Sequence, residues 1–131
     1  MKYLCLIYYD EERLDSLPEA ERNTLYAEAY AYYDELVRSG YGLAGDALHS
    51  VDMATTVRPQ AGKASITDGP YLQTKEQLAG YMLLEARDLD EAIRLAARIP
   101  PARLGGVEVR PIRDMRPAPS NGKDKQNDGY K

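Results

Sequence analysis

The chain has 131 residues, of which 44% are hydrophobic and 29% charged, and its formal net charge is −4. This size and balance are typical of one globular domain, and the negative charge argues against direct binding of nucleic acid, because phosphate contacts need a basic surface. No apolar run approaches the roughly 20 residues of a membrane helix, and the short apolar start has no cleavage site. We therefore predict a cytoplasmic protein that does not bind membranes.

The N-terminal part of the chain predicts a strand followed by a long helix. Residues 2–9 are almost all apolar, which indicates a strand covered on both faces, and the charged residues 10–13 end it in solvent. A helix is expected from a cap at Ser16, with proline in the first turn, to Arg38. Gly40 then ends the helix as a C-terminal cap residue.

The middle of the chain predicts a bent strand and a hairpin. Residues 41–48 carry two glycines, which indicate a strand with a bend or bulge. Two short strand-like runs follow at residues 54–58 and 63–67. Because Pro, Gln, Ala and Gly lie between them, we expect a hairpin turn at residues 59–62.

The C-terminal part predicts a strand, a helix and a last strand. Residues 80–86 are apolar on both faces, like residues 2–9. A helix capped by Asp88 should run to about Ile99, with Leu89 and Ile93 among its inward residues, until two prolines stop it. The last strand is expected at residues 106–113.

These elements indicate an α+β fold, a ferredoxin-like βαββαβ domain with an inserted β-hairpin. We assign the domain to residues 1–114 and expect a disordered tail at residues 115–131, which contain little to bury. Two helices can cover only one face of the sheet, so the other face needs a further layer. A second copy of the chain would supply it and would enclose a tyrosine-lined cavity, which predicts a homodimer.

The stretch from Thr67 to Glu76 carries the most varied chemistry in the chain. It begins with a carboxylate, turns at a Gly-Pro pair, presents an aromatic ring, and ends on a hydroxyl, an ammonium and a second carboxylate. The end of a buried strand does not need these groups, so the stretch is a candidate site. The alternative is a tight turn followed by a solvated loop, in which Lys75 and Glu76 form an ordinary exposed pair.

The predicted hairpin brings the single histidine toward this stretch. A turn at residues 59–62 would place Asp68 across from about Met53, a few residues from His49. A carboxylate can orient an imidazole that transfers protons, so Asp68 and His49 are the candidate catalytic pair. The alternatives are an exposed loop histidine and a turn aspartate that accepts hydrogen bonds from nearby amides.

Two arginines are candidates for binding substrate. Arg58 and Arg110 fall in strand-like segments and can hold an anionic molecule, because the guanidinium group suits carboxylate geometry. The alternative is internal pairing with Glu76, Glu85 or Glu108. In either case the cations would lie at the rim of a strand rather than in the core.

Other site chemistries find little support. One histidine and one cysteine cannot form a Cys/His zinc cluster, and no P-loop, dinucleotide fingerprint or nucleophile elbow is present. We therefore predict no metal and no cofactor. Cys5 lies inside the first strand, where a buried structural thiol is the expected role.

Several segments together resemble one known family. Residues 68–76, DGPYLQTKE, resemble the DGPFAETKE signature of the DGPF branch of YCII-related proteins. Further matches lie in the same order at residues 2–8, 54–58, 80–81, 89–92 and 107–111. The resemblance covers about residues 1–113 and implies a ferredoxin-like dimeric α/β barrel.

The implied function is less specific. YCII-related proteins resemble small enzymes with a proposed His–Asp centre, one relative being linked to dehydrochlorination of an aromatic intermediate. Activity in the DGPF branch is generally unassigned, and some members are associated with extracytoplasmic-function sigma factors. The signature implies site roles here for Asp68, Tyr71, Thr74, Lys75 and Glu76.

The chain also departs from the signature. Tyr71 keeps the aromatic ring and adds a hydroxyl, Leu72 adds bulk, and Gln73 removes one carboxylate. The glutamine argues against an essential acid or base at that position. More weight therefore falls on Asp68, which begins the signature.

Three functional hypotheses follow. The first is a dimer whose internal pocket takes a small anionic or aromatic molecule, with Asp68 and His49 as acid–base groups, Arg58 orienting substrate and Tyr71 lining the pocket. Elimination or isomerisation suits this set better than hydrolysis, because no activated nucleophile is visible. The second is a non-catalytic binding or accessory module that serves a regulatory partner, and the third makes the signature a structural loop between two chains. The sequence leaves open whether the protein is an enzyme.

Overall fold

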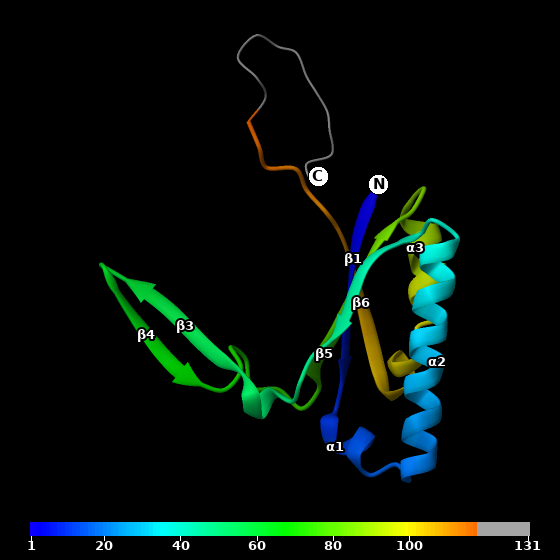
Figure 1. Cartoon of the computed structure of the whole chain (residues 1–131). Coiled ribbons are helices and arrows are strands. Elements are labelled where there is room, and N and C mark those ends of the chain that lie inside the picture. The colour runs from blue at the N-terminus through cyan, green and yellow to red at the C-terminus, as the bar shows by residue number, and fades with distance from the viewer. Residues whose placement is uncertain (118–131) are drawn as a thin grey trace.

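Four antiparallel strands form the central sheet of the computed structural model, which describes residues 1–117 (Figure 1). The strands lie in the order β2-β5-β1-β6. Their bounds are β1 Lys2–Tyr9, β2 Gly42–Ala47, β5 Gln77–Glu85 and β6 Gly105–Pro111. This order is compatible with the ferredoxin-like α+β fold expected from the sequence.

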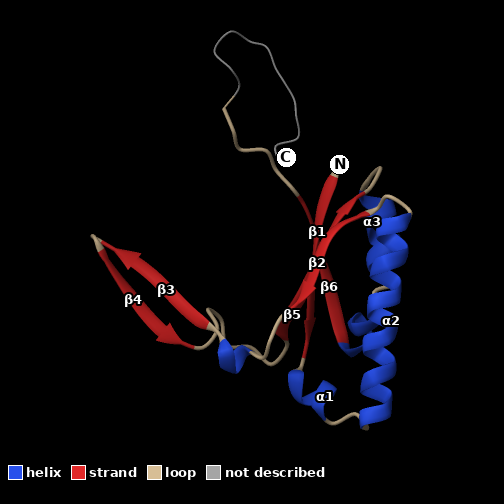
Figure 2. Ribbon diagram, in the orientation of Figure 1, coloured by secondary structure: helices blue, strands red, loops and turns tan. Residues whose placement is uncertain are grey.

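Helices cover one face of this sheet (Figure 2). The long helix α2 (Glu19–Arg38) and the shorter α3 (Leu89–Ala96) lie on that face, and the short α1 (Glu11–Asp15) follows β1. Two 3-10 turns, η1 (Val51–Met53) and η2 (Pro100–Leu104), complete the helical elements described. No helix of residues 1–117 lies over the opposite face of the sheet (Figure 2).

The hydrophobic core lies between the sheet and these two helices. β1 alternates between buried and half-buried residues, with Tyr3, Cys5 and Ile7 on the helix side. Leu36 and Leu84 meet them there and are almost completely buried. Burial raises the pKa of the Cys5 thiol to about 11, so the cysteine is a packed, protonated core residue.

The start of α2 differs from the prediction. Residues 10–13 do not simply end the strand in solvent, because α1 begins there with Asp10 as its N-cap, accepting a hydrogen bond from the Glu12 amide. Ser16 is the C-cap of α1, and α2 starts after Pro18 without a side-chain cap. The end of α2 is as expected, since Gly40 has a φ of 85°.

The second helical region is shorter than predicted, and its buried face is the predicted one only in part, because Ala92 and Ala96 are buried as expected. α3 ends at Ala96, and Leu89 and Ile93 are both 48% exposed rather than inward. Leu95 is buried in their place. The cap is as predicted, because the Asp88 side chain accepts a hydrogen bond of 2.9 Å from the Glu91 amide. Most of the predicted tail, from residue 118, lies outside the described residues.

The inserted hairpin consists of β3 (Thr55–Gln60) and β4 (Lys63–Asp68) and forms a separate two-stranded sheet. Its turn contains two residues rather than the four predicted. Ala61 and Gly62 both have positive φ, 45° and 82°, as a type I′ turn requires. The strands are therefore longer, and Asp68 pairs with Thr55 rather than lying across from Met53.

We call the uncovered side of the central sheet the open sheet face. Leu4 pairs with Leu83, and Leu6 pairs with Tyr81, on this side of β1 and β5. These side chains are half-buried in the single chain. The face also carries Tyr8, Ala44, Asp46, Glu108 and Arg110.

Candidate functional site

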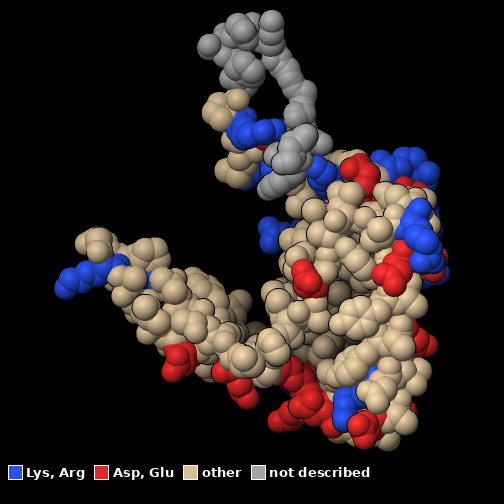
Figure 3. Space-filling model, in the orientation of Figure 1, with Lys and Arg blue, Asp and Glu red and all other residues tan. Residues whose placement is uncertain are grey.

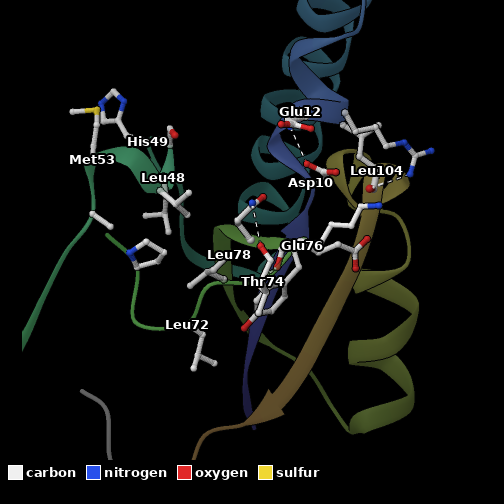
Figure 4. A pocket seen from close by; sticks show the side chains of 18 of the residues that line it. Asp10, Glu12, Leu48, His49, Met53, Leu72, Thr74, Glu76, Leu78 and Leu104 are labelled. Atoms are coloured by element: carbon white, nitrogen blue, oxygen red, sulfur yellow. Dashed lines mark hydrogen bonds between the residues drawn. The ribbon is translucent and has the colours of Figure 1, made fainter. Parts of the chain in front are cut away.

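A large cavity lies where the C-terminal end of β1 meets the base of the hairpin (Figure 4). Four separate segments line it, drawn from residues 8–16, 48–54 and 70–78, together with Leu104. Its volume of about 1510 Å³ exceeds the roughly 300–1,000 Å³ of typical small-molecule sites. The single chain therefore forms a wide depression rather than a closed pocket.

His49 belongs to this cavity. It lies in the loop between β2 and η1 and is exposed. In Figure 4 it lies with Met53 on one side of the cavity, and Asp10 and Glu12 lie on the other. Within residues 1–117 no hydrogen bond or ion pair restrains the imidazole, so neither ring nitrogen is held by a protein group there.

Asp68 is not part of the cavity lining. It is exposed at the end of β4, and among the described residues it makes no hydrogen bond or ion pair with His49. The two-residue turn explains this, because it shifts the pairing that would have carried Asp68 toward His49. The next residue, Gly69, donates its amide to the Ala54 carbonyl at 2.8 Å and has a φ of 112°. The catalytic roles of Asp68 and His49 stay predictions.

Two of the predicted binding residues contact each other. The Arg58 guanidinium carbon lies 4.5 Å from the centre of the Tyr71 ring, and its Nη1 donates to the Tyr71 hydroxyl at 3.3 Å. Tyr71 lines the cavity, whereas Arg58 does not. The arginine therefore supports one wall of the cavity through the tyrosine ring.

The end of the signature segment forms a tight loop at the cavity edge. The Thr74 hydroxyl donates to the Glu76 carbonyl at 2.7 Å, and the Gln77 side-chain amide donates to the Thr74 carbonyl at 3.3 Å. Thr74, Lys75 and Glu76 all line the cavity. These three predicted binding residues thus line one side of the cavity, and His49 lies on the other side (Figure 4).

Glu11 holds the histidine loop in place, and the sequence analysis did not select it. Its carboxylate accepts 2.8 Å and 3.0 Å hydrogen bonds from the Ser50 hydroxyl and the Val51 amide. Its own amide donates to the Gln77 side chain at 3.0 Å. Glu11, the first residue of α1, therefore connects this helix to two cavity walls. No sequence signal links residues about 40 and 66 positions apart.

Charge in the cavity does not favour a simple anion clamp. Three carboxylates, of Asp10, Glu12 and Glu76, line it together with two cations, Arg13 and Lys75. Arg13 is already engaged, since its Nη1 donates to the Leu104 carbonyl at 3.1 Å. Figure 3 shows acidic side chains gathered at the lower edge of the molecule, near the hairpin base.

Arg110 lies away from this cavity. It is on β6 opposite Leu4, near the other end of the open sheet face, and does not line the cavity. Its Nε is 3.7 Å from the Glu108 carboxylate, and both side chains are largely exposed. The internal pairing considered as an alternative is therefore present, and Arg58 and Arg110 do not form a joint clamp within one chain.

A family model places the chain among known proteins. The model of the YCII-related domain matches residues 1–116. The chain belongs to the YCII-related family. An uncharacterized protein of Rhizobium meliloti (strain 1021) is 32% identical over 119 residues, covering 89% of this chain and 96% of that protein.

Across residues 1–117, no three His, Cys, Asp or Glu side chains gather as a metal-binding group. The same part of the YCII-related chain has no helix that is long and apolar enough to cross a membrane.

Proposed function

We propose that this YCII-related protein belongs to the DGPF branch and is a homodimer that binds a small molecule with an apolar or aromatic part. The cavity carries this proposal, because it combines one histidine and several carboxylates with aromatic and aliphatic walls. Polar groups converging in a concave, largely apolar site are typical of ligand binding. Residues 68–76 support the branch assignment through their match to its signature.

The open sheet face supports the dimer. It carries five large, partly accessible side chains, those of Leu4, Leu6, Tyr8, Tyr81 and Leu83. A second copy can cover them by a two-fold contact in which each sheet packs on the other. Leu6→Asp should then yield monomers, because the dimer would have to bury an unpaired carboxylate.

His49 is the proton-transfer group in this proposal. It is among the residues that line the cavity, and its imidazole is free of protein hydrogen bonds within the described chain. Proton transfer suits elimination or isomerisation, for which a positioned base contributes about 10²–10⁴-fold. Turnover of a substrate should fall by at least about 100-fold in His49→Gln, whereas an unchanged rate would remove the catalytic role.

A non-catalytic binding module is the second candidate. The separation of His49 from Asp68 favours this candidate. Without the aspartate, the His49 imidazole has no carboxylate partner to fix its orientation for proton transfer. This candidate predicts saturable binding without turnover. It also predicts that His49→Gln changes ligand affinity only slightly.

Three one-ring probes test the binding proposal: benzoate, benzyl alcohol and benzylamine. They share a benzene ring and differ in charge, and we expect dissociation constants of about 1–10 mM from their small size. Three carboxylates in the lining should make benzoate the weakest. Amide shifts in a ¹⁵N–¹H titration should cluster at residues 48–54 and 70–78. Absence of saturable shifts with all three probes would overturn the proposal.

A further inference from the structure

The β3–β4 hairpin extends away from its own domain on the side opposite α2 and α3 (Figures 1 and 2). Each strand has six residues, which at about 3.3 Å per residue makes an arm of roughly 20 Å. Of the hairpin residues only Thr56 is half-buried, and all others are exposed. The arm therefore receives almost no support from the single chain.

One side of this hairpin is apolar beyond the Thr55–Asp68 pair at its base. Val57 pairs with Ile66 across the strands, and Pro59 pairs with Ala64 beside them. Val57 is 54% exposed and Ile66 is 69% exposed. A two-stranded hairpin is only marginally stable in water unless its apolar side packs on something. The apolar side of the hairpin thus requires a covering surface.

The position of the arm leaves room for a second copy beside the open sheet face (Figures 1 and 2). Packed sheets lie about 10 Å apart. The sheet of a copy packed on the open sheet face would therefore lie within the reach of the hairpin, whose length is about 20 Å. The apolar side of the hairpin presents six residues and the open sheet face nine, and these 15 residues correspond to a contact smaller than the roughly 20–30 residues a side of a standard interface. One two-fold contact can therefore cover both surfaces.

Charge agrees with this occupant. The hairpin, residues 55–68, contains Arg58, Lys63 and one carboxylate at its base, Asp68, whereas residues 10–15 contain four carboxylates and Arg13. Figure 3 shows the basic free end of the hairpin and the acidic lower edge of the body. Two copies of the chain therefore offer each other opposite charges, which favours correct pairing.

We infer that the hairpin is an intersubunit clasp: a second copy lies between the hairpin and the open sheet face and closes the cavity at the hairpin base. This inference rests on the homodimer proposed above. It also explains why the cavity is so wide in one chain. The site is incomplete until the second copy supplies its remaining wall.

Ile66→Asp tests the clasp. Each dimer contains two altered arms, so we expect its dissociation constant to rise at least about 100-fold, measured by sedimentation equilibrium. Tyr30→Asp on α2 is the matched control, because Tyr30 is also 69% exposed but lies in the helical layer. Its dissociation constant should match that of the wild type. Benzyl alcohol should bind more weakly to Ile66→Asp, because the cavity then stays open.

The outcomes separate the clasp from the dimer itself. If the wild type is a monomer at 10 μM, both proposals fail. If Leu6→Asp is monomeric while Ile66→Asp dimerises like the wild type, the sheet-face dimer stands and the clasp is wrong. Amide hydrogen exchange gives an independent readout, since residues 57–66 should be protected in the wild-type dimer and exchange quickly in Leu6→Asp. Equal exchange in both would also overturn the clasp.

Discussion

Replacing Glu11 should loosen the loop that carries His49 without unfolding the domain. The Glu11 carboxylate accepts two hydrogen bonds from this loop, from the Ser50 hydroxyl and the Val51 amide. Hydrogen bonds to charged groups contribute about 1.5–3 kcal/mol, but exposure of the Ser50 side chain lowers that contribution here. We therefore expect Glu11→Ala to reduce the free energy of opening the loop by about 2 kcal/mol.

Amide hydrogen exchange measures this opening. The Met53 and Ala54 amides donate to the Ser50 and Val51 carbonyls, so they report on the loop without contacting Glu11. A reduction of about 2 kcal/mol corresponds to roughly 30-fold faster exchange at both amides. Glu11→Gln keeps one acceptor oxygen and should give an intermediate rate.

Glu12→Ala is the matched control for this experiment. It removes the same charge from the next residue, whose exposed side chain lines the cavity. Exchange at Met53 and Ala54 should stay at the wild-type rate in this variant. If Glu11→Ala also leaves both rates unchanged, the carboxylate does not hold the histidine loop and our description of this wall is wrong.

Three further predictions concern the core and a helix cap. Leu84→Ala should lower the free energy of unfolding by about 2–5 kcal/mol in urea, because Leu84 is fully buried, whereas Leu89→Ala at a 48% exposed position should cost under about 1 kcal/mol. Burial raises the pKa of the Cys5 thiol to about 11, so Cys5 should resist a thiol reagent at pH 8 and react at once when guanidinium unfolds the protein. Rapid reaction of the native protein would contradict the burial of this thiol. The hydrogen bond that Asp88 accepts from the Glu91 amide lowers the pKa of its carboxyl group below 3.8. The stability lost in Asp88→Ala should therefore be largest above pH 3.8 and should vanish as the pH falls through the folded-state pKa. Thermal unfolding measures this loss, and Asp90→Ala is the control.

The sequence predicts those parts of the fold that depend on local pattern. The continuous apolar run at residues 2–9 correctly predicted β1. The end of α2 at Arg38, followed by Gly40 with a positive φ, was also predicted. The start of that helix was misplaced, because Ser16 satisfies the cap pattern but closes α1 instead. The short α1 and the long α2 follow each other closely, and the pattern alone does not say which helix uses the polar residues between them.

The candidate site was harder to predict because it depends on pairing between distant segments. The two-residue turn moved Asp68 to a position opposite Thr55, which separated it from the proposed partner. Arg58 and Tyr71 were both selected, but their mutual contact follows from the return of the loop after β4. Glu11 was missed because its partners lie far along the chain.

The single histidine gives the most direct test of the cavity as a ligand site. Because the chain contains one His, the Hε1 resonance of His49 is unambiguous in a proton NMR spectrum. Titration with benzyl alcohol should shift this resonance along a saturable curve with a dissociation constant of about 1–10 mM. A His49 resonance that stays fixed while the probe binds elsewhere, or does not bind, would contradict a functional cavity at the base of the hairpin.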